Sequence, residues 1–190
     1  GFLNIISIFS FIGISLGVAV LIIVMSVMNG FRTDLINKIV GFNAHAIVKP
    51  YETTLLSETY KENNLLKNSV LSVIFSNDGE AVILNKNYTK GLLLKGYFNN
   101  DFKSLNIVKN NLFYGTKELK ENSISIGKHL SFNLNLDIGD KVTLMSPSGV
   151  KTIVGSLPKQ EIFIVTSIFD SGLADFNEKI AYINLKSLES

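Results

Sequence analysis

The chain has no cysteine among its 190 residues. This absence excludes disulfides, thiolate catalysis, cysteine-based zinc sites and iron–sulfur clusters. The only two histidines, His45 and His129, have no ligand-type side chain three or four residues further on. The sequence therefore predicts no metal site.

Catalytic motifs are missing too. The chain contains no Walker lysine motif, no GxGxxG and no GxSxG. Asp137 and Asp140 flank a short turn and lack the spacing of an EF-hand calcium loop. The net charge of +2 is too small, and the basic residues too scattered, for nucleic-acid binding. We expect no enzyme activity, no cofactor and no nucleic-acid partner.

Charge is absent from the whole N-terminal stretch, since no side chain ionises before Arg32. The mostly apolar run from Ile5 to Met28 is long enough, as a helix rising about 1.5 Å per residue, to cross a hydrocarbon core of about 30 Å. A signal peptide has a shorter apolar core of about 7–15 residues and a small-residue cleavage site, which this run lacks. We predict a transmembrane helix over residues 1–30.

Small residues are spaced along this predicted helix. Gly13 and Gly17 form a GxxxG pair, and Ser15 and Ala19 repeat the spacing. Such pairs let a second helix approach closely, although glycine is also common in membrane helices generally. Because the run contains no acid or base, we expect no ion relay within it.

Helical spacing continues beyond the run. Phe31, Leu35 and Ile39 share one face, and Gly41 is a typical residue just past a helix end. Residues 31–43 are predicted to form a stalk and connector, either a rigid continuation of the span or a short linker.

Residues 44–190 have the pattern of an α+β domain, because short strands and short helices alternate without βαβ regularity. Asn77-Asp78-Gly79 is a strong hairpin-turn signal between two of the expected strands. The strands are expected over 44–48, 70–75, 80–84, 91–96, 123–126, 140–145, 162–165 and 181–183, and the helices over 55–66, 112–119, 127–134 and 184–190.

Two prolines bracket an unusual connection. Ten residues separate Pro147 from Pro158, whereas hairpin loops usually hold about 2–5. The segment carries Ile153, Val154 and Leu157, and its only charged residue is Lys151. It could protrude as a β-hairpin arm whose apolar side chains are covered either by a docking partner or by the domain's own surface.

Several segments together resemble the permease subunits of the lipoprotein-releasing ABC transporter, the LolC/LolE family. The resemblance is carried by ranges that follow one another along nearly the whole chain: 13–19, 23–32, 41–45, 126–128, 139–144, 146–149 and 181–183. The Met28-Asn29-Gly30-Phe31 junction is its most specific part. Residues 51–122 match only loosely.

The resemblance implies a bacterial inner-membrane protein with a MacB-like periplasmic domain after its first span. The implied partners are a second permease subunit in a homo- or heterodimer, a cytoplasmic ATPase subunit, a periplasmic lipoprotein chaperone and the lipoprotein substrate. The chain would be a fragment, with further membrane spans after its periplasmic domain.

The resemblance also implies two functional regions. A proline-bracketed hairpin would dock the chaperone, and the outer part of the first span would line a lipid cavity. The implied docking residues are Pro147, Val150, Ile153, Val154, Leu157 and Pro158, and the implied cavity residues are Met25, Val27 and Met28. Two alternatives stay open: a related MacB-like export or cell-division permease, and a membrane-anchored periplasmic domain that senses a small ligand.

Overall fold

The computed structural model describes residues 1–42, 46–49, 73–86, 88–109, 112–152 and 155–189. The chain divides into two units, Gly1–Asn43 and Ala44–Ser190. The first unit is one helix and the second is a mixed α/β domain, which confirms the predicted α+β class.

The helix α1 runs without interruption from Phe2 to Phe42, 41 residues in all. The predicted N-terminal apolar helix is therefore present, and it extends past residue 30 through the expected stalk. Its segment Phe2–Ile36 contains an 18-residue stretch with a mean hydropathy of 2.8 and is long and apolar enough to cross a membrane. Near its end Asp34 and Lys38 form an ion pair of 2.9 Å, one turn apart.

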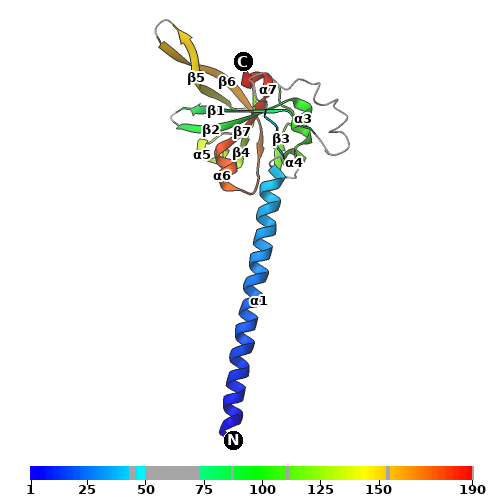
Figure 1. Cartoon of the computed structure of the whole chain (residues 1–190). Coiled ribbons are helices and arrows are strands. Elements are labelled where there is room, and N and C mark those ends of the chain that lie inside the picture. The colour runs from blue at the N-terminus through cyan, green and yellow to red at the C-terminus, as the bar shows by residue number, and fades with distance from the viewer. Residues whose placement is uncertain (43–45, 50–72, 87, 110–111, 153–154, 190) are drawn as a thin grey trace. The chain divides into compact units, whose positions relative to one another are not determined.

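The domain is built on one mixed sheet (Figure 1). Its strands are β1 (Ser76–Asn85), β2 (Tyr88–Tyr97), β3 (Phe113–Gly115), β4 (Ser123–Gly127), β5 (Lys141–Thr152), β6 (Gly155–Phe169) and β7 (Ile180–Asn184). Its helices are α3 (Asn99–Ser104), α4 (Asn106–Lys109), α5 (Lys128–Leu134), α6 (Ala174–Lys179) and α7 (Leu185–Glu189). The strand order is β3-β6-β4-β7-β2-β1-β5, and β5 also pairs with β6, so six strands form a closed circuit.

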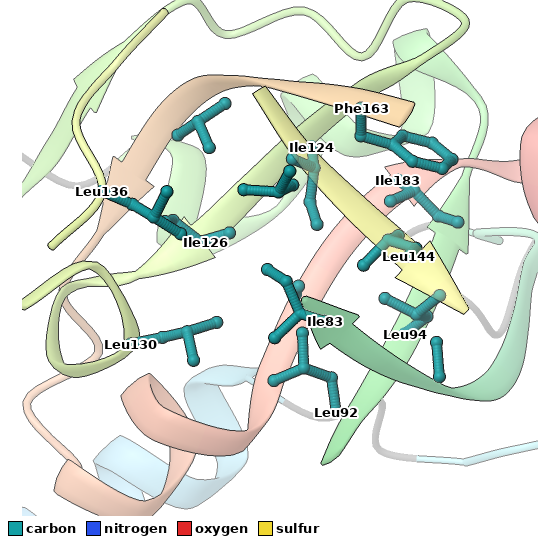
Figure 2. Close-up of a cluster of buried hydrophobic side chains, with 14 of the residues drawn as sticks. Ile83, Leu92, Leu94, Ile124, Ile126, Leu130, Leu136, Leu144, Phe163 and Ile183 are labelled. Carbon is teal, nitrogen blue, oxygen red and sulfur yellow. The ribbon is translucent and has the colours of Figure 1, made fainter. Parts of the chain in front are cut away.

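The interior of this circuit is the main hydrophobic core (Figure 2). Each of the six strands contributes two alternate residues to it, as expected when one face of a strand is buried. They are Ala81, Ile83, Leu92, Leu94, Ile124, Ile126, Val142, Leu144, Phe163, Val165, Ala181 and Ile183. Leu130 and Leu134 of α5 and Leu136 complete the cluster.

A second, aromatic core lies on the other face of β7. The ring of Tyr182 is 5.0 Å from Phe169, 5.7 Å from Phe102 and 5.9 Å from Tyr97, measured between ring centroids. Phe102 comes from α3, and α4 adds buried Ile107 and Val108. The domain therefore has apolar layers on both faces of its central strands.

Several sequence predictions of secondary structure are confirmed within a few residues. The strands expected over 91–96, 123–126, 140–145, 162–165 and 181–183 correspond to parts of β2, β4, β5, β6 and β7, and the helices expected over 127–134 and 184–190 correspond to α5 and α7. The helix expected over 55–66 lies outside the described residues.

Four predictions are wrong. Residues 46–48 and 73–75, expected within strands, have no regular secondary structure. The helix expected over 112–119 is replaced by the short strand β3, in which buried Phe113 pairs with Phe169. Asn77-Asp78-Gly79 does not turn: it lies inside β1, where Gly79 pairs with Leu94, and the β1–β2 turn instead passes through Lys86, whose φ is 50°.

The ladder between β5 and β6 continues well beyond the core. Val150 pairs with Leu157 and Thr152 with Gly155, and the two strands run past the others in Figure 1. A register shift between Ser146 and Val150 places the first proline in a bulge.

Pro158 does not interrupt this ladder, for a geometric reason. The Ile164 amide donates to Asn122, on the β4 side, and the Val165 amide donates to Asp140, on the β5 side. Because successive residues of a strand direct their amides to opposite edges, the nitrogen of Pro158 lies on the edge away from β5. A proline lacks a backbone donor and commonly ends a ladder, but at this position of β6 it does not.

Candidate functional site

The candidate docking region is the distal β5–β6 ladder, defined as residues 147–152 and 155–158. The side chains of Pro147, Leu157 and Pro158 are exposed, Leu157 to 63%. Ile153 and Val154 lie outside the described residues, and of Val150 only the backbone is described. Three of the six predicted docking side chains are thus described, and all three are exposed on the part of β5 and β6 that extends beyond the core.

Polar groups separate this ladder from the core. Lys159 and Glu161 form an ion pair of 2.8 Å, and the Gln160 side-chain amide lies 3.8 Å from the sulfur of Met145. Both partners of the ion pair are partly exposed, so the pair adds little stability. The base of the distal ladder is therefore polar, in contrast to exposed Leu157.

The strand β6 also exposes large aliphatic side chains nearer the core. Residues 162–165 form a continuous apolar run, which predicts burial on both faces. Only Phe163 and Val165 are buried, whereas Ile162 is 61% and Ile164 is 41% exposed. The sequence run alone could not reveal this second exposed apolar surface.

The predicted membrane sites all lie on α1. A Cβ atom added to Gly13 or Gly17 would have no neighbouring atom within 4 Å, so both positions are open to a second helix. Met25, Val27 and Met28 are each exposed by more than 60%. These residues are accessible as the predicted helix contact and lipid cavity require, and both roles remain predictions.

No metal or catalytic centre emerges from the described part of the chain. No group of three His, Asp or Glu side chains there is placed to hold a metal ion. Burial raises the pKa of Tyr97 to about 12 and also raises the pKa of Tyr182, which suits their packing in the aromatic core. Neither tyrosine is suited to proton transfer near neutral pH.

The most developed polar cluster is structural. The Gly172 amide donates to Asp170 at 2.9 Å and lowers the pKa of that carboxyl, which burial raises, while Asn177 and Lys128 lower it further. The buried Asn177 amide donates to Asp170 at 2.7 Å, and its oxygen accepts from Ser171. These hydrogen bonds stabilise the turn from β6 to α6, and no sequence motif predicted them.

Curated relatives match the chain along its length. It is 26% identical over 193 residues to the lipoprotein-releasing system transmembrane protein LolC of Xylella fastidiosa, with 100% of the chain and 46% of the relative covered. It is 30% identical to LolC of Buchnera aphidicola, covering 90% of the chain and 43% of the relative. It is 29% identical to LolE of Haemophilus influenzae, covering 84% of the chain and 40% of the relative.

No family model matches the chain. The chain spans about half the length of the curated relatives that it matches. These relatives are transmembrane proteins of lipoprotein-releasing systems, and the apolar helix α1 agrees with a transmembrane protein. The similarity to several LolC and LolE proteins along the chain supports its place in the LolC/LolE family.

Proposed function

We propose that this chain is part of a permease subunit of an ABC transporter that releases lipoproteins from the bacterial inner membrane to a periplasmic chaperone. The observation that carries the proposal is the whole-length similarity to LolC of a chain that combines an apolar membrane-length helix with a folded domain. The permease itself is not an enzyme. A separate cytoplasmic subunit hydrolyses ATP, and a second permease subunit completes the membrane part.

In this proposal the domain lies in the periplasm and its distal ladder is the docking arm for the chaperone. The antiparallel register from Val150 to Gly155 supports a self-supporting two-stranded arm. Exposed Leu157 supports an apolar contact, since a large aliphatic side chain at an arm's end gains most when a partner removes it from water. Ile153 and Val154, which follow Thr152 in the sequence, belong to the same proposed contact.

The helix α1 is the proposed first span. Gly13 and Gly17 are the proposed contact with another helix, because small residues four apart permit close backbone approach. Met25, Val27 and Met28 are proposed to line the lipid cavity. Their exposure supports this role, and flexible methionine side chains adapt to acyl chains of different shape.

A MacB-like export or cell-division permease would share the span and the domain but would dock a different protein. A ligand-sensing domain would need a pocket in the β region, whereas two side chains from each of the six strands fill the interior of the circuit. The packed interior favours the permease over the sensor.

Crosslinking tests the docking proposal. A photoreactive residue at Leu157 in the assembled transporter should crosslink to the lipoprotein chaperone. Leu157→Asp should abolish chaperone capture and leave ATP hydrolysis intact, because a carboxylate in an apolar contact must be desolvated. Phe132→Asp on α5 is the matched control, since Phe132 is 86% exposed and belongs to a different element.

Capture that persists in Leu157→Asp, together with no crosslink from Leu157, would remove the docking role. A crosslink to a different periplasmic protein would favour the export or cell-division alternative.

A further inference from the structure

The domain contains a single sulfur atom, that of Met145. The chain has no cysteine and three methionines, and the other two, Met25 and Met28, lie on α1. A methionine thioether is readily oxidised to the sulfoxide, which is a polar group. Oxidation of the domain by a peroxide is therefore directed to Met145.

Met145 lies at the point where β5 leaves β1. Its register partners are Val82 of β1 and Gln160 of β6. The Val82–Met145 pair is the outermost pair of the ladder between β1 and β5, and the register shift between β5 and β6 follows Ser146. A chemical change at the Met145 sulfur therefore acts where the core part of β5 meets the distal ladder.

The Met145 side chain lies on the outer face of β5. Val142 and Leu144 are buried in the main core, and successive side chains of a strand point to opposite faces, so Met145 points away from that core. The residue is only partly buried. A small oxidant dissolved in water can reach it without unfolding the domain.

The Gln160 side chain is placed to accept an oxygen atom added to this sulfur. Its amide nitrogen Nε2 lies 3.8 Å from Met145 Sδ and donates to it. A thioether sulfur is a weak acceptor, whereas a sulfoxide oxygen carries partial negative charge. The same amide therefore gains a better acceptor when Met145 is oxidised.

The Gln160 amide also limits the damage that oxidation causes. A sulfoxide among apolar side chains disrupts their packing, and a polar group withdrawn from water without a partner destabilises the fold. Here the oxidised group would lie on an outer face beside a donor. The fold is therefore expected to tolerate the sulfoxide.

We propose that Met145 is a modification site at which a peroxide forms methionine sulfoxide, and that Gln160 is the residue that binds the added oxygen. The thioether sulfur attacks one oxygen of hydrogen peroxide, the O–O bond breaks and a sulfur–oxygen bond forms. The sulfur loses two electrons, and the other oxygen leaves as water after taking up the proton of the transferred oxygen. The modification requires neither a transporter partner nor the docking role.

Peroxide treatment of the full chain in detergent micelles tests the site. Peptide mass spectrometry measures the oxygen added to each methionine over time, and urea unfolding is measured before and after treatment. Met145 should be oxidised before Met25 and Met28, because the hydrocarbon of the micelle covers the apolar helix α1. The oxidised wild type should stay folded with a small decrease in its urea midpoint, and Met145→Leu should show no decrease.

Two variants test the role of Gln160. Gln160→Leu removes the amide, and Gln160→Glu keeps the shape of the side chain but replaces the donor with an acceptor. In both variants peroxide should lower the urea midpoint about twofold further than in the wild type, because the sulfoxide oxygen then has no donor. Thr143→Val is the matched control: it removes a hydroxyl from the same face of β5, leaves Gln160 in place and should respond as the wild type does.

Sulfoxide on Met25 and Met28 but not on Met145 would overturn the modification site. Equal decreases of the urea midpoint in the wild type and in both Gln160 variants would overturn the role of Gln160. Unfolding of the oxidised wild type, or an equal decrease in Met145→Leu, would overturn the proposal as a whole.

Discussion

Two buried hydroxyl groups allow a sharp test of the fold. Ser125 and Ser167 are paired in the register of β4 and β6, and both are fully buried. Neither hydroxyl oxygen has a hydrogen-bond partner among the residues that the structure describes. A buried hydroxyl without a partner loses its bonds to water and gains nothing in exchange, which costs about 1–3 kcal/mol.

Replacing either serine with alanine should therefore stabilise the domain. Alanine is close in size and carries no group that needs a partner, so the free energy of unfolding should rise by about 1 kcal/mol. For a domain of this size that shift raises the Tm by about 2–4 °C. The double variant should gain less than the sum, because the two positions are neighbours.

Ser123→Ala is the control and should lower the free energy of unfolding instead of raising it. Ser123 lies on the same strand and is also buried, but its hydroxyl donates to the Lys120 carbonyl at 2.7 Å. Its loss should destabilise the domain by about 1 kcal/mol.

Urea unfolding in detergent, followed by tyrosine circular dichroism, measures these changes. All six tyrosines follow residue 43, so α1 contributes no signal. Destabilisation by Ser125→Ala equal to that of Ser123→Ala would refute the argument that the Ser125 hydroxyl is unsatisfied.

Further predictions concern pH, packing and tyrosine ionisation. The lowered pKa of Asp170 implies stability that is present at neutral pH and is lost as the pH falls below about 4. The free energy of unfolding of Asp170→Asn should therefore fall less on acidification than that of the wild type. Gly127→Ala should destabilise the domain by about 2 kcal/mol or more in urea unfolding, since its Cβ would lie 2.1 Å from the Asn177 carbonyl oxygen, and Gly91→Ala should not. In an absorbance titration of Tyr97→Phe, the phenolate absorbance that appears near pH 12 should shrink, and the phenolate absorbance that appears at lower pH should be unchanged. A loss of the absorbance at lower pH would contradict the raised pKa of Tyr97.

Local patterns in the sequence were sufficient for much of the fold. The charge-free run predicts α1, and the alternation over residues 140–145 predicts the inner half of β5. In both cases the residues that decide the structure are neighbours along the chain. The similarity to LolC likewise follows from motifs that the sequence shows directly.

Other features depend on residues far apart in the sequence. Asn77-Asp78-Gly79 predicts a turn, but the approach of Leu188, more than a hundred residues later, explains why a glycine stands within a strand. The aromatic core joins Tyr97, Phe113 and Tyr182 from three strands, and no periodicity within one segment indicates it. The closure of β5 onto β6 and β1 is likewise a long-range pairing.

The same limit applies to the candidate site. The two prolines predict a long connection over residues 147–158, but their spacing in the sequence does not show that Pro158 directs its nitrogen away from β5. Exposure of Ile162 and Ile164 depends on which face of β6 the sheet closes over, and this is a tertiary property.

The position of Pro158 has a consequence for solubility. A two-stranded ribbon that projects from a protein offers its outer edges to any unfolded or foreign strand, and such pairing leads to aggregation. Pro158 withholds a donor on the outer edge of β6 at no cost to the pairing with β5, and the neighbouring Lys159 adds a charge. The distal ladder is thereby protected against edge-to-edge pairing and polymerisation.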